Sequence, residues 1–162
     1  YINGSDSLVF TKNKTLYGLH QALSEEKSVT TFNVVEGYYD VLASDTHDVV
    51  GTVAAMGTAI SEENIRMLAR HAGDGGTINF IFDADVAGRD AAVRAMESSL
   101  PIYDGAVNYS FVFLPDGEDP DTFLNKYGKD IYQDYISQKG YTLSNLMLSV
   151  CRRDMNMQKD ED

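Results

Sequence analysis

The chain has 162 residues, of which 43% are hydrophobic, so it can form one domain with a real core and wholesale disorder is not expected. It contains no apolar run close to the roughly 20 residues that a membrane helix requires, and no signal peptide is visible, so we expect no membrane association. The formal net charge is −12, whereas most nucleic-acid-binding domains carry a basic stripe. A nucleic-acid partner would therefore need a basic surface on another segment, or metal ions at the contact.

Cys151 is the only cysteine, which excludes an internal disulfide and a cysteine-rich zinc site and fits a reducing cytoplasm. The three histidines lie far from one another and from Cys151 in the sequence, so they predict no transition-metal site. Tyr1 is not an initiator methionine, and we expect the chain to be a segment of a longer protein.

Segments typical of helices and strands alternate along most of the chain. The first helix is expected over 14–24, where three leucines share one face. Runs of β-branched and aromatic residues predict strands at 31–35, 49–54, 77–82 and 108–114. Helical spacing predicts intervening helices at 38–44, 62–72 and 86–99. This alternation is typical of βαβ units, so we predict an α/β fold with a mostly parallel sheet of about four strands flanked by helices.

After Pro120 the pattern becomes helical only. Helices are expected at 122–126, 129–137 and 143–150. The stretch from Arg152 onward is polar and is expected to fray. The sequence therefore predicts a C-terminal helical extension to the sheet domain.

Acidic residues occur near the predicted ends of three strands. Glu36 comes directly after the first strand, and Gly37 permits a tight turn that directs the Glu36 carboxylate toward the mouth of a cleft. Asp40 lies about one helical turn further on and is expected to face the same side. In an open parallel sheet, the carboxyl ends of the strands line the ligand cleft. The alternative is that Glu36 is solvated and that Asp40 is a first-turn helix charge.

Asp83 and Asp85 follow the third strand, two residues apart, so in extended backbone their side chains share a face. Such a pair can hold one or two Mg²⁺ ions that keep several water ligands. Two metals about 4 Å apart could stabilise both the attacking and the leaving oxygen of phosphoryl transfer. The alternative is that Asp85 caps the following helix while Asp83 is merely exposed.

The segment Asp119-Pro120-Asp121 follows the fourth strand. Asp at the N-cap and Pro at the first helical position favour a helix start, which by itself accounts for Asp119. A metal or nucleotide role would be additional. Because clustered carboxylates repel one another unless a cation neutralises them, the three acidic groups together predict a magnesium-type site at one edge of the sheet.

Two other classes of phosphate chemistry use similar elements. Haloacid dehalogenase phosphatases have Asp-x-Asp after a strand, and response regulators have a phosphorylatable Asp in a flavodoxin-like sheet. Neither class requires the Glu-Gly-x-x-Asp element that residues 36–40 form after an earlier strand.

The motifs EGYYD at 36–40, MGT at 56–58 and DADVAGR at 83–89 resemble the toprim domain of primases, topoisomerases and small nucleases. Three further segments narrow the resemblance to DnaG-type DNA primases of bacteria and phages: FTKNKTLYG at 10–18, AGRDAA at 87–92 and FLPDGEDPDT at 113–122. The resemblance covers about residues 1–150 and implies a Rossmann-like toprim fold. The sequence departs from the family at Ala84, where glycine is common.

The resemblance implies a DNA-directed RNA polymerase that joins ribonucleoside triphosphates into RNA primers on single-stranded DNA. It implies Glu36, Asp83 and Asp85 as ligands of Mg²⁺ or Mn²⁺, with Glu36 also as a general base. It implies Lys12 as a basic residue near the active site, with a solvated surface lysine as the alternative. The supporting acidic positions of the same cleft would be Asp40, Asp119 and Asp121.

The resemblance also divides the expected functions between this chain and segments outside it. Zinc is expected only in an N-terminal domain, the basic half of the polymerase core in a preceding subdomain, and the contact with the replicative helicase elsewhere. The expected domains are a leading segment and helix at 1–30, the catalytic toprim subdomain at 31–127, a helical extension at 128–150 and a polar tail at 151–162. We expect a cytoplasmic protein whose present segment binds Mg²⁺ or Mn²⁺ weakly and makes no primers alone.

Two other functions stay open at this point. A toprim nuclease or topoisomerase subunit would use the same metals to cleave phosphodiesters, but none of the ten tyrosines has a context that marks it as a nucleophile. A non-catalytic module that docks a helicase or DNA partner would have no specific divalent-metal site.

Overall fold

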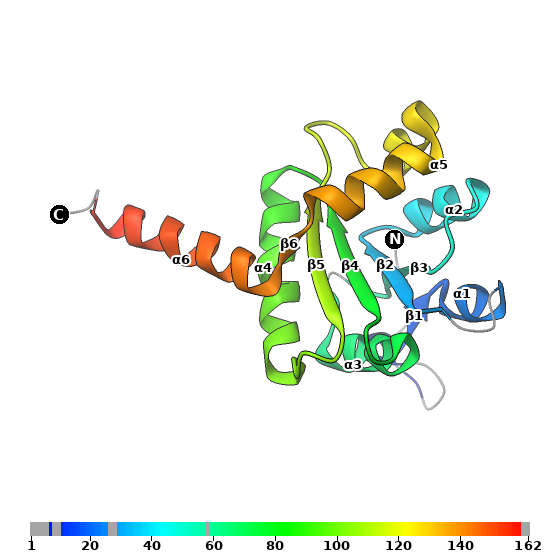
Figure 1. Cartoon of the computed structure of the whole chain (residues 1–162), viewed down its shortest axis with the longest axis horizontal. Helices are drawn as coiled ribbons and strands as arrows, with labels where there is room; N and C mark the ends of the chain where they lie inside the picture. The colour runs from blue at the N-terminus through cyan, green and yellow to red at the C-terminus, as the bar shows by residue number, and fades with distance from the viewer. Residues whose placement is uncertain (1–6, 8–10, 26–28, 58, 160–162) are drawn as a thin grey trace.

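A mixed β-sheet forms the centre of the molecule (Figure 1). The computed structural model describes residues 7, 11–25, 29–57 and 59–159, with side chains for all of these except Glu25 and residues 153–159. Phe10 and Thr58, which belong to two of the motifs above, lie outside the described residues. The sheet has the order β1-β3-β2-β4-β5-β6. Its strands are β1 (Leu16–Tyr17), β2 (Thr31–Val35), β3 (Thr52–Ala55), β4 (Thr77–Phe82), β5 (Asn108–Phe113) and β6 (Tyr141–Thr142).

The four central strands are parallel, and the two-residue strands β1 and β6 pair antiparallel at the two edges. The predicted α/β fold with a mostly parallel sheet is therefore confirmed, and the structure adds two short edge strands. The helices are α1 (Leu19–Glu25), α2 (Tyr38–Thr46), α3 (Glu62–Ala72), α4 (Val86–Ser99), α5 (Pro120–Lys139) and α6 (Leu143–Lys159), with 3₁₀ turns η1 (Lys12–Lys14) and η2 (Leu100–Ile102).

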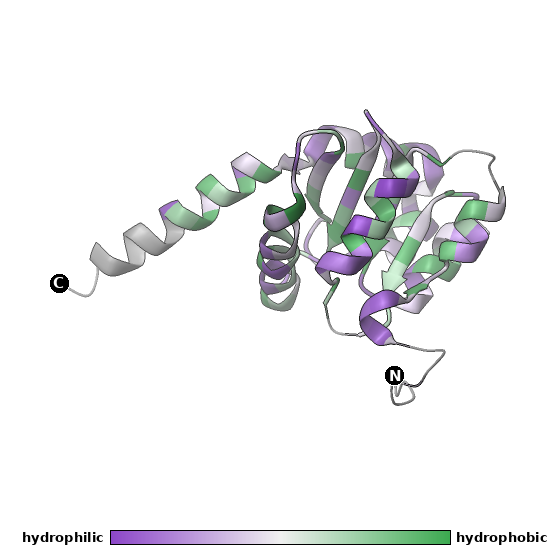
Figure 2. Ribbon diagram, turned by 90° about the horizontal axis from the view of Figure 1, so that it is seen from below, coloured by the Kyte–Doolittle hydropathy of each residue, from purple (hydrophilic) through white to green (hydrophobic). Residues whose placement is uncertain are grey.

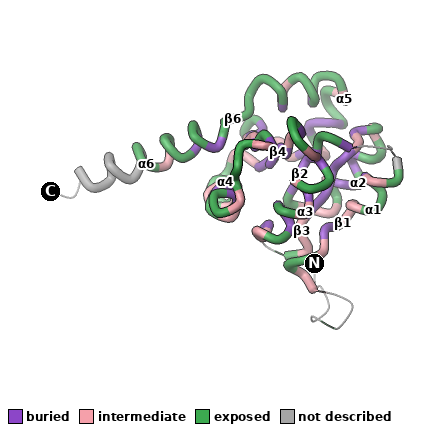
Figure 3. Tube along the Cα trace, turned by 60° about the horizontal axis from the view of Figure 1, so that its bottom comes forward, coloured by how far each residue is buried: buried purple, intermediate pink, exposed green. Residues whose placement is uncertain are grey.

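Two apolar cores lie on opposite faces of the sheet, because alternate strand residues point to opposite sides. On one face Phe80 and Phe111 stack at 4.9 Å between ring centroids and pack with Ile65 of α3 and Ala92 of α4. The opposite core is covered by α2 and α5, and its members include Val35, Ile81, Val112, Val41, Phe123 and Tyr132. Hydropathy and burial follow this layering, with apolar, buried residues along the strands (Figures 2 and 3).

The expected helix over 14–24 is wrong in its first half. Leu16 and Tyr17 instead form β1, which pairs with Ala55 and Ala54 of β3, and the helix begins only at Leu19. Gly18 separates the two elements with φ +82°, a left-handed conformation that favours glycine. A Cβ atom at Gly18 would also lie 2.9 Å from the carbonyl oxygen of Thr52, so the turn depends on glycine.

The C-terminal part contains the predicted helices with different boundaries. Helix α5 is broken at Gly128, where φ is 79° and ψ is 171°, so it consists of two helical segments as the sequence predicted. Helix α6 continues to Lys159, past its predicted end at 150, and extends away from the sheet (Figure 1). Within the described part of the chain, no helix is both long enough and apolar enough to cross a membrane.

Candidate functional site

The site is built at the edge where the parallel strands end. Val34 of β2 pairs with Phe80 of β4, so Glu36 and Asp83 leave neighbouring strands within about one residue of the same level. The backbone N–H of Asp83 favours the charged form of the Glu36 carboxylate and so lowers its pKa. The sheet register therefore brings together two acidic residues that are 47 positions apart in the sequence.

Burial and nearby negative charges destabilise the charged forms of Glu36 and Asp83. Partial burial raises the pKa of Glu36, and the negative charges of Asp83 and Asp85 raise it further, while the Asp83 N–H and the guanidinium of Arg94 oppose this effect. Burial also raises the pKa of Asp83, with the charges of Asp119 and Asp85 acting in the same direction. Negative charge is thus concentrated in one partly desolvated place.

Asp40 belongs to the same cluster. Its Oδ2 accepts a hydrogen bond from the Gly37 N–H at 2.9 Å, which holds the carboxylate against the turn that follows β2. Burial raises the pKa of Asp40 to about 6, and the charges of Asp119, Asp83 and Glu36 raise it as well, although the Gly37 hydrogen bond lowers it. We call Glu36, Asp40, Asp83, Asp85 and Asp119 the acidic cluster.

Asp85 caps helix α4, as the structural alternative predicted. Its Oδ1 accepts a hydrogen bond from the Gly88 N–H at 2.7 Å. Gly88 lies so close to the preceding loop that a Cβ atom there would be 2.2 Å from the carbonyl oxygen of Asp83. The cap uses one carboxylate oxygen of Asp85, and the glycine sets how closely α4 approaches the Asp83 backbone.

The stretch after β5 contributes one member to the cluster. Asp119 caps α5 by accepting from the Thr122 N–H at 2.7 Å, and its charge also acts on Asp40 and Asp83. Asp121 instead accepts a hydrogen bond from Asn125 Nδ2 at 2.7 Å along the helix. Asp119 has the strongest charge effect on Asp40 and Asp83, and Asp121 is not among the main charges that act on either.

Lys12 lies in η1, which is held against the start of α3. Ser61 Oγ donates to the Asn13 carbonyl at 2.6 Å, and Lys14 Nζ lies 3.6 Å from Glu63. Helix α3 follows β3, and β3 is parallel to β2, so the carboxyl ends of both strands lie at the same end of the sheet. The contacts with α3 therefore place η1 near the end that carries the acidic cluster. The main charge effects on Glu36, Asp40 and Asp83 do not come from Lys12, so its active-site role stays a prediction.

The donor set suits a hard divalent cation but does not form a closed cage. Among the residues that the structure describes, no three His, Cys, Asp or Glu side chains gather as a metal-binding group. Mg²⁺ is usually held by only one or two carboxylates and keeps several waters, so an open set of acidic oxygens is compatible with it. Burial is the largest cause of the raised pKa values of Glu36, Asp40 and Asp83, and neighbouring negative charges add to it. Such a cation would neutralise these charges and relieve their repulsion.

Sequence reasoning missed Arg94, the cation that acts on Glu36. Arg94 is an exposed residue in the middle of α4, and no motif marks it. Only the packing of α4 on the sheet brings its charge near the carboxylates.

With this geometry established, comparison with known proteins identifies the class. Residues 33–124 match the Toprim-like family, and the chain belongs to that family. It is 38% identical over 157 residues to a DNA primase of Legionella pneumophila, which covers 97% of this chain and 27% of that protein. The predicted resemblance to the toprim domain of DnaG-type primases is confirmed.

Solved structures of DNA primase domains support the same family assignment. The chain matches the crystal structure of a DNA primase domain from Pseudomonas aeruginosa with a TM-score of 0.87 and 40% identity, over 92% of this chain and 46% of that one. It matches a DnaG primase catalytic domain bound to single-stranded DNA with a TM-score of 0.86 and 35% identity, over 93% of this chain and 46% of that one. The chain spans about a quarter of the length of the Legionella primase and about half of these catalytic structures.

Proposed function

We propose that this chain is the metal-binding part of a DnaG-type primase active centre. The observation that carries the proposal is the acidic cluster, in which burial and neighbouring carboxylates raise the pKa values of Glu36, Asp40 and Asp83, in a chain whose relatives are DNA primases. Groups with perturbed pKa values that converge in one place are typical of functional sites, because the surrounding fold would otherwise avoid such repulsion. The relatives favour primer synthesis over the cleavage of phosphodiesters.

Glu36, Asp83 and Asp85 are the proposed ligands of Mg²⁺ or Mn²⁺. When bound, the cation supplies neutralisation of triphosphate oxygens and a lower pKa for the primer 3′-hydroxyl. The Gly88 N–H fixes one oxygen of Asp85, so this side chain is held in place beforehand, and the Asp83 N–H favours the charged form of Glu36. Glu36 is also the proposed general base, since a carboxylate with a raised pKa is a better proton acceptor.

The remaining acidic residues have supporting roles in this proposal. Asp40 and Asp119 add negative charge beside the ligands, which strengthens the attraction for cations. Asp121 is proposed as an outer acidic position, and its hydrogen bond with Asn125 limits how far it can turn toward the cluster. Lys12 is proposed to contact substrate phosphates from the η1 side.

The whole reaction belongs to a longer protein. We propose that it copies a single-stranded DNA template into RNA primers from ribonucleoside triphosphates, in the cytoplasm. The basic surface, a zinc-binding N-terminal domain and the contact with the replicative helicase would lie in other segments. Within this chain, 1–30 would lead in from the preceding half, 31–127 form the toprim subdomain, 128–150 a helical extension and 151–162 a polar tail; the break at Gly128 supports the boundary at 127.

Metal binding can be tested directly on this chain. A Mn²⁺ titration followed by NMR should broaden amide resonances first near Asp83, because paramagnetic broadening falls steeply with distance. Asp83→Asn should abolish the focused broadening, whereas Asp74→Asn, in an exposed loop after α3, should preserve it. Broadening spread evenly over the acidic surface would overturn the metal proposal and favour a non-catalytic docking module.

Catalysis is tested in the full-length protein. Asp83→Ala should reduce primer synthesis on a single-stranded template by several orders of magnitude, because the reaction depends on metal-assisted charge neutralisation. Asp74→Ala should retain normal synthesis. Primer synthesis that is unchanged in the Asp83 variant would refute the catalytic assignment.

A further inference from the structure

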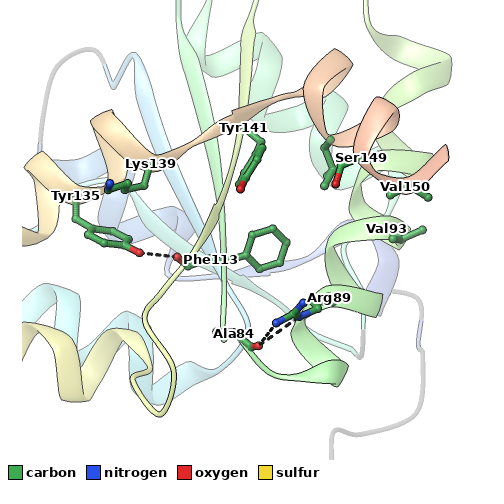
Figure 4. A pocket seen from close by; sticks show the side chains of 10 residues that line it. Ala84, Arg89, Val93, Phe113, Tyr135, Lys139, Tyr141, Ser149 and Val150 are labelled. Carbon is green, nitrogen blue, oxygen red and sulfur yellow. Dashed lines mark hydrogen bonds between the residues drawn. The ribbon is translucent and has the colours of Figure 1, made fainter. Parts of the chain in front are cut away.

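A cavity of about 380 Å³ opens beside the acidic cluster, between the start of α4, the end of α5, the β5–β6 edge and α6 (Figure 4). Ala84, which separates Asp83 from Asp85, forms part of its wall. None of the proposed metal ligands lines the cavity, so it is a separate compartment next to them. We call it the α4–α6 cavity.

Aromatic side chains form one wall of the α4–α6 cavity. Phe113 of β5 and Tyr141 of β6 meet edge to face, with ring centroids 6.2 Å apart and planes at 70°. The Tyr135 hydroxyl donates to the Phe113 carbonyl at 3.0 Å, so this ring is held in place as well. Tyr141 is 47% exposed and points into the cavity, where a flat ligand could stack on its open face (Figure 4).

Cations flank these rings. Arg89 lies on the α4 side, where its Nε and one terminal nitrogen donate to the Ala84 carbonyl at 3.4 and 3.2 Å. Those two bonds hold the guanidinium at the cavity wall and leave its other N–H groups for a ligand. Lys139 lies on the opposite side, beside Tyr135 (Figure 4).

The charge of the cavity is opposite to that of the molecule. The chain has 25 acidic and 13 basic residues, yet the cavity lining contains two basic side chains and no carboxylate. Within the described part of the chain, neither Arg89 nor Lys139 forms a salt bridge. This is therefore a place where an acidic protein can accept an anion with a flat ring attached.

We propose that the α4–α6 cavity binds one nucleotide, with its base stacked on the exposed ring of Tyr141 and its phosphate held by Arg89 and Lys139. Stacking on aromatic side chains combined with Arg or Lys contacts to phosphate is the general way in which proteins bind single-stranded nucleic acid. The inference deepens the proposed function, on which it rests, because it supplies a strand or nucleotide subsite beside the metal-binding edge. The ligand is either a nucleotide within a single strand or a free nucleotide, since both carry the same base and phosphate.

Binding can be measured with this chain in EDTA, so that metal ions do not contribute. The probes are a fluorescein-labelled single-stranded DNA oligonucleotide, followed by anisotropy, and an unlabelled nucleoside triphosphate as competitor. Tyr141→Leu should weaken oligonucleotide binding about fivefold or more, the range expected for loss of one stacked base. The matched control Tyr103→Leu replaces a tyrosine of similar exposure just after η2, at the other end of the sheet, and should bind normally.

The phosphate contacts have a second readout in salt dependence. Arg89→Gln and Lys139→Gln should each lower the slope of log affinity against log salt by about 0.7, because one phosphate contact is lost. Arg70→Gln, on the exposed face of α3, should leave the slope unchanged. Far-UV circular dichroism checks that each variant is folded, so a loss of binding cannot be assigned to unfolding.

The outcomes separate this inference from the proposed function. Competition by the triphosphate at its own affinity identifies a free-nucleotide site, and binding of the oligonucleotide alone identifies a strand site. If Tyr141→Leu and Arg89→Gln bind like their controls, or if neither probe binds, the inference is overturned. Asp83→Asn should bind the oligonucleotide as well as the wild-type chain or better, because it removes a negative charge beside the cavity. If the wild-type chain binds the oligonucleotide but shows no focused Mn²⁺ response, the proposed function alone is overturned.

Discussion

Asp40 connects the chemistry of the site to the stability of the fold. Its pKa is raised from 3.8 to about 6 in the folded chain, first by burial and then by its acidic neighbours. The folded state therefore binds a proton more readily than the unfolded state between these two pH values. The stabilisation from that proton is fully present below about pH 4 and is lost as pH rises through about 6. The raised pKa values of Glu36 and Asp83 act in the same direction.

Asp40→Asn should therefore stabilise the metal-free chain at pH 7.5 by about 1 kcal/mol and have less effect near pH 5. The asparagine Oδ1 can still accept the Gly37 N–H, so the main change is the loss of a charge that burial and its acidic neighbours destabilise. Urea unfolding at both pH values measures the difference, with Asp74→Asn as the exposed control. Equal stabilisation by Asp40→Asn at both pH values would contradict the raised pKa of Asp40.

Two tyrosines of α5 allow a paired test of buried hydroxyl groups. Tyr132 is fully buried, and its hydroxyl has no hydrogen-bond partner within the part of the chain that the structure describes. The Tyr135 hydroxyl, in contrast, donates to the Phe113 carbonyl at 3.0 Å. Burying a polar group without a partner costs free energy, whereas a satisfied hydrogen bond contributes to stability.

Tyr132→Phe should consequently leave the free energy of unfolding unchanged or raise it by up to about 1 kcal/mol. Tyr135→Phe should lower it by about 1 kcal/mol, because the Phe113 carbonyl loses its donor. Chemical denaturation of both variants gives the comparison, and each serves as the control for the other. A destabilised Tyr132 variant would indicate a partner for that hydroxyl, such as a buried water.

Helices and strands could be predicted where the local residue pattern and the strand pairing in the folded chain favour the same structure. The strands β2 and β4 were predicted with their observed bounds, because both are short β-branched and aromatic runs buried on both faces. The helix over 14–24 failed because the spacing of Leu16, Leu19 and Leu23 fits a helix, while β3 offers Leu16 and Tyr17 a pairing partner. Strand β6 was missed for a different reason, because its two residues are too few to give a periodic signal.

Gly88 sets the contact between helix α4 and the loop that carries the site. Alanine normally favours a helix interior over glycine by about 1 kcal/mol. Here a Cβ atom would lie 2.2 Å from the Asp83 carbonyl oxygen, so the helix would have to move away from the loop. Gly88→Ala should destabilise the chain by about 1–3 kcal/mol, a typical cost of overpacking.

Thermal unfolding tests this effect against a matched substitution. Gly57→Ala adds the same methyl group at a position with open space around it and no left-handed φ, so its effect should stay within about 0.5 kcal/mol. Gly88→Ala should also broaden or displace the focused Mn²⁺ response near Asp83. Equal stability of the two variants would mean that α4 does not depend on this close approach.

At the scale of the whole molecule, topology made part of the site predictable. Carboxylates that follow parallel strands must meet at one sheet edge, so Glu36 and Asp83 could be paired before the structure was known. The sequence also predicted Asp85 and Asp119 as possible helix caps. Each does cap a helix, and each also belongs to the acidic cluster. The α4–α6 cavity was not predictable, since it depends on β6 placing Tyr141 next to Phe113.

The net charge of −12 and the acidic cluster should respond differently when salt is added, and the melting temperature reports the difference. General self-repulsion is screened by any electrolyte, so NaCl should raise the melting temperature gradually and without saturation. A specific divalent site adds a saturable stabilisation of the folded state, about 1.4 kcal/mol when the cation concentration is ten times the dissociation constant.

For a chain of this size, that stabilisation corresponds to a melting temperature about 3–6 °C above the value in NaCl of equal ionic strength. Asp83→Asn should lose this excess and keep the NaCl response, whereas Asp74→Asn should keep both. Coincident Mg²⁺ and Na⁺ curves for the wild-type chain would show that only bulk screening operates, because a cation held by the carboxylates at the ends of β2 and β4 must stabilise the folded state beyond it.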